Sequence, residues 1–126
     1  MGGIPEHTTG DATDAVYVSN DLVASGGVLT GWTVHPHALP SPLAYHDVGV
    51  IEETIYVVGG TDDTSTGSGV VSDAILMMDP AAGTWTRIGT MPRPVMSHAS
   101  VGFGERVFSF GGYVEPDYLD DTTAFY

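Results

Sequence analysis

Two histidines separated by one proline, His35 and His37, are the residues that could most simply begin a metal site. In a strand, alternation would place both imidazoles on one face, and imidazole nitrogens are common zinc ligands. No third ligand with suitable spacing is identifiable, and Pro36 favours an edge strand or a loop. We therefore predict no metal site and keep His35 and His37 as candidates for binding a ligand.

Acidic residues gather in two polar segments of the chain. Asp62 and Asp63 lie in a stretch rich in Gly, Ser and Thr over residues 61–69, and Asp117 lies in a connection over residues 115–121. Carboxylates clustered on loops could hold calcium, but the ordered spacing of a dedicated calcium loop is missing. We predict solvated loops here, with Asp62, Asp63 and Asp117 as binding candidates and no cofactor.

The residue types that carry covalent catalysis are scarce. The chain has no cysteine, which excludes thiol nucleophiles, thiolate metal sites and disulfides within the chain. No Ser/His/Asp arrangement stands out, and the paired acids lie in segments where solvation is the simpler explanation. We predict no catalytic residue in this chain.

The strongly negative net charge of the chain indicates which classes of molecule it can bind. Three arginines, no lysine and sixteen acidic residues give the 126-residue chain a formal net charge of −13. A surface of this sign repels phosphate backbones and anionic lipids, so nucleic acids and membrane surfaces are excluded as expected partners. No apolar run approaches the ~18 residues of a membrane helix, and residues 1–10 do not resemble a signal peptide. Cationic ligands or high-salt surroundings suit the composition better.

The elements that position these residues are predicted to be strands. Seventeen glycines and eight prolines stand among short runs of Val, Ile, Tyr and Phe, a composition that favours many strands joined by tight turns. Nearly the whole chain is therefore expected to be β structure.

An internal repeat organises these strands. Residues 39–46 align with residues 91–98 at an offset of 52, and residues 55–60 align with residues 107–112 at the same offset. Trp32 and Trp85 are paired at an offset of 53. Two separate landmarks with one period indicate a repeat architecture.

The order of landmarks resembles the kelch repeat: Pro and His before a first strand, an apolar second strand closed by Gly-Gly, a third strand ending in Asp-Pro, and a Trp opening the fourth strand. The family's usual basic residue before His is absent, and only one Asp-Pro turn occurs. The resemblance implies an all-β segment of a kelch-type β-propeller, built of four-stranded antiparallel blades. Its expected parts are third and fourth strands over residues 1–38, a complete blade over 39–90, and first to third strands over 91–126.

Each repeated residue has an expected structural role. The pairs Gly59-Gly60 and Gly111-Gly112 let the backbone adopt conformations closed to other residues, and no helical pattern follows them to form a phosphate site. Both tryptophans are expected to pack between neighbouring blades. The equivalent residues His46 and His98 are expected to be hydrogen-bonded histidines in the core of each blade.

The predicted function is a binding module that recognises a protein or glycan through its propeller loops. The alternative is part of a sugar-active kelch enzyme resembling sialic-acid mutarotases, with His35, His37 or the loop acids transferring protons. The copper-radical oxidases of the family need a cysteine, which this chain lacks. About two blades expose strand edges and apolar faces, so we also expect self-association or coverage by the remainder of a longer propeller.

The composition makes one testable prediction about salt. Excess negative charges on a small domain repel one another, and salt screens that repulsion. The melting temperature of the chain should therefore be higher in molar sodium chloride than in dilute buffer. Thermal unfolding followed by circular dichroism checks this, and a melting temperature that is level or lower in molar salt would reject it.

Overall fold

The computed structural model describes residues 12–62, 70–114, 117–118 and 122–125, and all regular elements in these ranges are strands. The expected all-β class is therefore confirmed. Within the described residues there is no helix long and apolar enough to cross a membrane.

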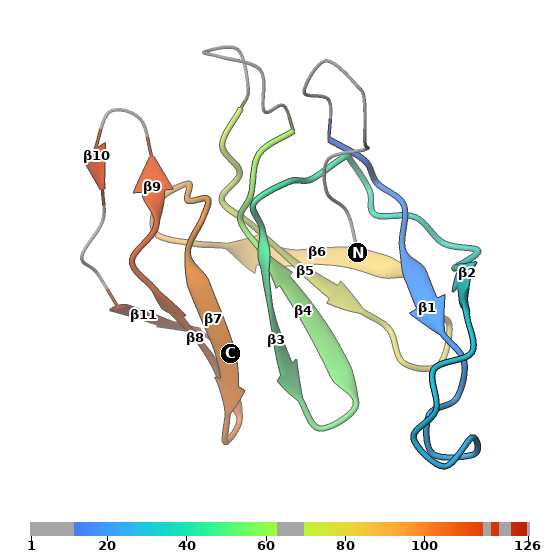
Figure 1. The fold of residues 1–126 in the computed structure, drawn as a ribbon. Helices are drawn as coiled ribbons and strands as arrows, with labels where there is room; N and C mark the ends of the chain where they lie inside the picture. The colour runs from blue at the N-terminus through green and yellow to red at the C-terminus, as the bar shows by residue number, and fades with distance from the viewer. Residues whose placement is uncertain (1–11, 63–69, 115–116, 119–121, 126) are drawn as a thin grey trace.

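A four-stranded antiparallel sheet occupies the middle of the molecule (Figure 1). Its strands are β3 (Asp47–Ile51), β4 (Thr54–Val58), β5 (Ala74–Met78) and β6 (Trp85–Thr90), hydrogen-bonded in that order. The pairing of β5 with β6 shifts register between Ile75 and Leu76. The four-stranded blade expected from the repeat is confirmed, and we call β3 to β6 the central blade.

Smaller sheets flank the central blade on both sides (Figure 1). On one side, β1 (Tyr17–Ser19) pairs with β2 (Trp32–Val34). On the other side, the order β11-β8-β7 forms a three-stranded sheet, which we call the last blade. Its strands are β7 (Ala99–Phe103), β8 (Arg106–Phe110) and β11 (Thr122–Phe125), and a short hairpin of β9 (Tyr113–Val114) and β10 (Asp117–Tyr118) interrupts the connection from β8 to β11.

The 52-residue repeat extends to backbone conformation. Tyr45 and Ser97, 52 residues apart, have φ values of 53° and 52°, a region that non-glycine residues rarely adopt. The second glycine of each Gly-Gly pair, Gly60 and Gly112, has a φ of 97° and 106°. These last values are accessible mainly to glycine, which explains the repeated Gly-Gly.

Hydrogen bonds between connecting segments repeat in the same way. The amide of Leu39 donates to the carbonyl of Asp14 at 2.9 Å, and the amide of Met91 donates to the carbonyl of Asp73 at 2.7 Å. Because Leu39 and Met91 are 52 residues apart, Asp14 and Asp73 hold equivalent places. The segment before β1 is therefore built like the segment before β5.

The joint between the central and last blades is unusually close at β3 and β7. A Cβ on Gly102 would overlap the carbonyl oxygen of Val50, and a Cβ on Gly49 would lie 2.7 Å from Cγ1 of Val107. The amide of Ser100 donates to the carboxylate of Asp47 across this joint. Glycine on both strands allows this approach, and the charged hydrogen bond holds it.

Two apolar clusters fill the two sides of the central blade. One contains Val16, Leu39, Leu43, Val57, Ala74 and Leu76, with Val48 and Trp85 packed against it. The other contains Val58, Ile75, Met91, Val95 and Val107, with Ile51 and Tyr56 packed against it. Each fully buried valine contributes on the order of 1.5–3 kcal/mol relative to an exposed one. The central blade is thus held by apolar contacts on both faces.

The expected packing of both tryptophans between blades is met only in part. Trp85 and Tyr56 are only half-buried, although both contact an apolar cluster. Trp32 does not pack between blades, because 62% of its surface is exposed. Both β1 and β2 are short strands paired only with each other among the described strands, so the face of β2 that carries Trp32 lies open.

The close joint predicts a large effect of one methyl group. Gly102→Ala should lower the free energy of unfolding by about 1–3 kcal/mol, because the new Cβ meets the backbone of Val50, which cannot rotate away. Gly89→Ala in β6 is the matched control, since nothing lies within 4 Å of its Cβ position. Urea unfolding of the two variants measures the difference. Equal stability of the two variants would contradict the close joint.

Candidate functional site

A pocket of about 320 Å³, lined by both polar and apolar residues, lies at the end of the central blade where β4 ends and β5 begins. We call it the loop-face pocket. Its polar lining consists of Ser41 before β3, Asp62 after β4, Ser72 and Asp73 before β5, and Arg87 in β6. Antiparallel pairing brings these four segments to one end of the sheet, although they are far apart in sequence.

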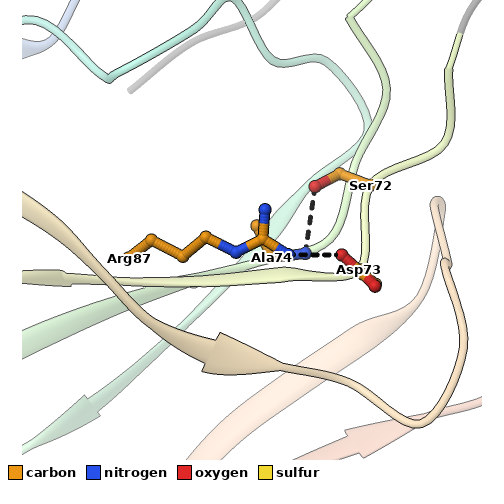
Figure 2. Close-up of polar contacts among 4 residues, drawn as sticks. All are labelled: Ser72, Asp73, Ala74 and Arg87. Carbon is orange, nitrogen blue, oxygen red and sulfur yellow. Dashed lines mark hydrogen bonds and ion pairs between the residues drawn. The ribbon is translucent and has the colours of Figure 1, made fainter.

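Arg87 and Asp73 form an ion pair in this pocket (Figure 2). Nη2 of Arg87 donates to Oδ1 of Asp73 at 2.7 Å, and the two side chains are 54% and 39% exposed. An exposed pair of this kind stabilises a fold by at most about 1 kcal/mol. Its main effect is therefore to place a cation beside an anion at the pocket surface.

Two further hydrogen bonds shape the pocket. The hydroxyl oxygen of Ser72 accepts the amide of Ala74 at 3.0 Å, which orders the entry into β5 (Figure 2). Oδ1 of Asp62 accepts a hydrogen bond from the amide of Val70 at 2.7 Å.

The other two predicted acidic residues cannot be placed in the pocket. Asp63 lies outside the described residues. The backbone of Asp117 is part of β10, but its side chain is not described.

The lining carries one cation beside several hydrogen-bond acceptors. Two carboxylates and one guanidinium leave an excess of one negative charge, and the carboxylate and hydroxyl oxygens accept hydrogen bonds. No histidine is among the described residues that line the pocket. A ligand with ammonium, guanidinium or hydroxyl donors would match this set of groups.

The structure places His35 and His37 away from this pocket. Their ring centroids are 5.7 Å apart, and Nδ1 of His35 accepts the amide of His37 at 3.1 Å. The ring of His35 lies against Gly83, whose Cβ position is 3.2 Å from Cε1. Gly83 belongs to the turn after β5, whereas Asp62 lies near the start of β5. In the described part of the chain, no group of three or more potential ligands could hold a metal ion.

His46 and His98 lie near the joint between the blades. His98 contacts the central blade, because a Cβ on Gly59 would lie 2.9 Å from its Cε1. Neither ring nitrogen of His98, nor Nδ1 of His46, has a hydrogen-bond partner among the described residues, although these atoms are buried. His98 therefore departs from the expectation of a hydrogen-bonded core histidine at both ring nitrogens, and His46 departs from it at Nδ1.

Burial governs the protonation of both rings. It lowers the pKa of His98, and the Asp47 carboxylate and the Val58 backbone offset this only in part. It also lowers the pKa of His46, with repulsion from His98 adding to the effect and Asp47 opposing it. A buried imidazole loses hydration on becoming charged, so both rings favour the neutral form.

Sequence reasoning identified Asp62 but missed most of the loop-face pocket. Arg87 is one of three basic residues in an acidic chain, and Asp73 is a landmark of the repeat. Neither fact alone points to a site. Only the pairing of β5 with β6 brings Arg87 and Asp73 within 2.7 Å.

Comparisons with known proteins agree with the repeat. A family model described as the Kelch motif matches residues 42–92. Beta-scruin of Limulus polyphemus is 32% identical over 74 residues, which cover 59% of this chain and 8% of that protein. Kelch-like protein 41 of Mus musculus is 29% identical over 85 residues, which cover 68% of this chain and 13% of that protein. The chain thus spans a small part of the length of both relatives.

A solved structure, titled "Structure of YjhT", has a similar fold. It aligns with a TM-score of 0.74 and 19% sequence identity over 97% of this chain and 37% of that chain. At this identity the likeness concerns the fold, which is that of a kelch-type β-propeller segment.

The buried histidines predict a dependence of stability on pH. Because both pKa values are lowered from 6.5 in the folded chain, the unfolded chain binds more protons below that pH. Stability should therefore be highest well above pH 6.5 and decrease as the pH falls through pH 6.5 toward the lower pKa values of the folded chain. Urea unfolding at constant ionic strength measures it. The double variant His46→Gln/His98→Gln should flatten the dependence, and greater stability of the wild type at the lower pH would refute the prediction.

Proposed function

The chain belongs to the kelch-repeat family, and on that premise we propose that it is a binding module whose loop face recognises a protein or glycan partner. The observation that carries the proposal is the loop-face pocket, where Asp62, Asp73 and Arg87 meet at one end of a rigid blade. Loops held by a packed scaffold are common places for recognition.

Charge favours a protein partner with basic residues. The chain has a formal net charge of −13, and the pocket adds a local excess of one carboxylate. Such a surface attracts a cationic segment over long range and speeds its association. The carboxylates of Asp62 and Asp73 would then accept hydrogen bonds from lysine or arginine side chains. A glycan would use the same acceptors and the two serine hydroxyls, without the long-range attraction.

The arrangement gives less support to the mutarotase-like alternative. The alternative assigned proton transfer to His35, His37 or the loop acids. These candidates lie apart, since His35 lies at the turn after β5 while Asp62 lies near its start. Proton transfer needs groups within hydrogen-bond reach of one substrate. Nuclear magnetic resonance of sialic-acid anomers tests the alternative directly. Interconversion that is catalysed by the chain and lost in His37→Ala would establish it instead of the binding function.

The binding proposal is tested with arrays and a charge-matched pair of variants. An array of peptides rich in Arg and Lys, and a glycan array, provide the probes, and fluorescence anisotropy gives the Kd of each hit. Asp62→Asn/Asp73→Asn should weaken binding by about tenfold or more, because two acceptors inside the site are changed.

The control removes the same two charges from the opposite end of the blade. The control variant is Glu52→Gln/Glu53→Gln. Both glutamates lie in the turn between β3 and β4, and both side chains are exposed. It should change the Kd less than about threefold, mainly through long-range attraction. An equal loss in both double variants would show that the overall charge, and not the loop-face pocket, governs binding.

A further inference from the structure

The loop between β1 and β2, over residues 20–31, exposes apolar side chains at its tip. Residues 22–34 contain no charged side chain, although the whole chain has a formal net charge of −13. Side chains exposed over 44–93% of their surface in this loop are those of Leu22, Val23, Val28 and Leu29. We call these four residues the apolar tip. Apolar residues gathered at the surface in this way mark a contact with another molecule, whereas scattered ones do not.

Hydrogen bonds to the backbone give this loop a defined conformation. Oδ1 of Asp21 accepts two backbone amides, each at 2.9 Å, which caps the start of one helical turn. The amide of Gly27 donates to the carbonyl of Leu22 at 2.6 Å. The amide of Gly26, whose φ is 67°, donates to the carbonyl of Val23 at 3.2 Å. These last two bonds form the Schellman pattern that ends a helical turn, so part of the apolar tip stands on a turn capped at both ends.

The polar side chains of the loop bind its own backbone. Nδ2 of Asn20 donates to the carbonyl of Val28 at 2.9 Å, and Oδ1 of Asn20 accepts the amide of Thr30 at 2.8 Å. The hydroxyl of Ser25 donates to the same Val28 carbonyl at 2.7 Å. Polar groups therefore serve the loop itself, while the apolar tip is left in contact with solvent. A loop ordered in this way before binding loses little conformational freedom when a partner covers it.

The turn between β5 and β6 shows that this conformation does not require apolar side chains. Oδ1 of Asp79 accepts the amides of Ala81 and Ala82 at 2.8 and 3.0 Å. Oδ1 of Asp21 accepts the amides of Val23 and the next residue in the same way, so Val23 holds the place of Ala81. An alanine is enough to form the turn, and Val23 is 93% exposed. Folding of the loop therefore does not explain the valine.

The turns around the apolar tip are acidic. In Figure 1, β1, β3, β5 and β7 all run downward, so the connections that follow them lie at the end of the molecule opposite the loop-face pocket. The loop with the apolar tip extends furthest in this direction (Figure 1). The connections and the first residue of β8 carry five carboxylates and one guanidinium, those of Asp21, Glu52, Glu53, Asp79, Glu105 and Arg106. The uncharged tip therefore projects from an end of the molecule with an excess of negative charge.

We infer that the apolar tip docks into an apolar cleft of a separate protein, and that lysine or arginine side chains border this cleft. Aliphatic side chains on one projecting loop are best removed from water in a concave apolar site. The acidic turns would then face the border of the cleft, where basic residues supply the complementary charge. A second copy of the chain or an anionic bilayer would instead meet these turns with charge of the same sign. The inference is independent of the proposed function, because the apolar tip and the loop-face pocket share no residue.

Nuclear magnetic resonance of the valine and leucine methyl groups tests the inference, because it reports binding at each site separately. The probe is a helical peptide of leucine and lysine, with leucines along one face and lysines along both borders of that face. Its titration should shift the methyl signals of the apolar tip to saturation, and these shifts give the Kd at the tip. The same peptide with glutamate in place of lysine should bind the tip about tenfold or more weakly, because its border carries the wrong charge.

Two variants make the same substitution at opposite ends of the molecule. Val23→Ser should weaken the Kd read from Val28 and Leu29 about fivefold or more, because an aliphatic contact is lost. Val70→Ser is the control, since Val70 is 68% exposed and lines the loop-face pocket. It should change the Kd at the tip less than about twofold, because the two sites are distant. Both variants should keep the melting temperature of the wild type, since both valines are exposed.

Four results would overturn the inference. The first is that the leucine–lysine peptide leaves the methyl signals of the apolar tip unshifted. The second is an equal Kd at the tip for the two peptides, or for the wild type and Val23→Ser. The third is loss of the tip signals on adding phosphatidylcholine vesicles, which would make a bilayer the occupant. The fourth is a shift of the tip signals with the concentration of the chain alone, together with a doubled mass by light scattering, which would make a second copy the occupant.

Discussion

The fold depends on how closely the first strands of neighbouring blades approach each other. At the joint between β3 and β7, the backbones come so near that Gly49 and Gly102 cannot carry side chains without displacing Val107 or the Val50 carbonyl. This approach lets Val58 of one sheet, Val107 of the other and Val95 of the segment between β6 and β7 form one apolar cluster. Without it the sheets would separate, because a single sheet buries too little apolar surface to be stable alone.

The same closeness imposes an electrostatic cost at the joint. Asp47 uses its carboxylate to accept the Ser100 amide across the joint, while the buried nitrogens of His98 have no such partner among the described residues. Buried polar groups without hydrogen bonds are costly, and an imidazole in this position is better tolerated when neutral. The joint is therefore held by packing and by Asp47, and the imidazoles make it sensitive to acid.

The rigid joint also determines where recognition chemistry can lie. Packing on both faces of the central blade leaves its ends more open to other molecules than its middle. One end carries the loop-face pocket, where the pairing of β5 with β6 brings Arg87 next to Asp73, the residue directly before β5. The carboxylate of Asp62, which lines the same pocket, accepts a hydrogen bond from the Val70 amide. The scaffold thus presents charged groups in fixed positions.

Sequence alone determined the repeat, the strands and the positions of the two Gly-Gly pairs. These features are local: turns need glycine at particular φ values, strands need alternating apolar residues, and both recur every 52 residues. Tertiary structure decided what lies next to what. Strand pairing brought Arg87 into an ion pair with Asp73. The length of β5 separated His35 from Asp62, and Trp32 remained exposed. Such outcomes depend on contacts between residues far apart in sequence, which no local pattern of residue types specifies.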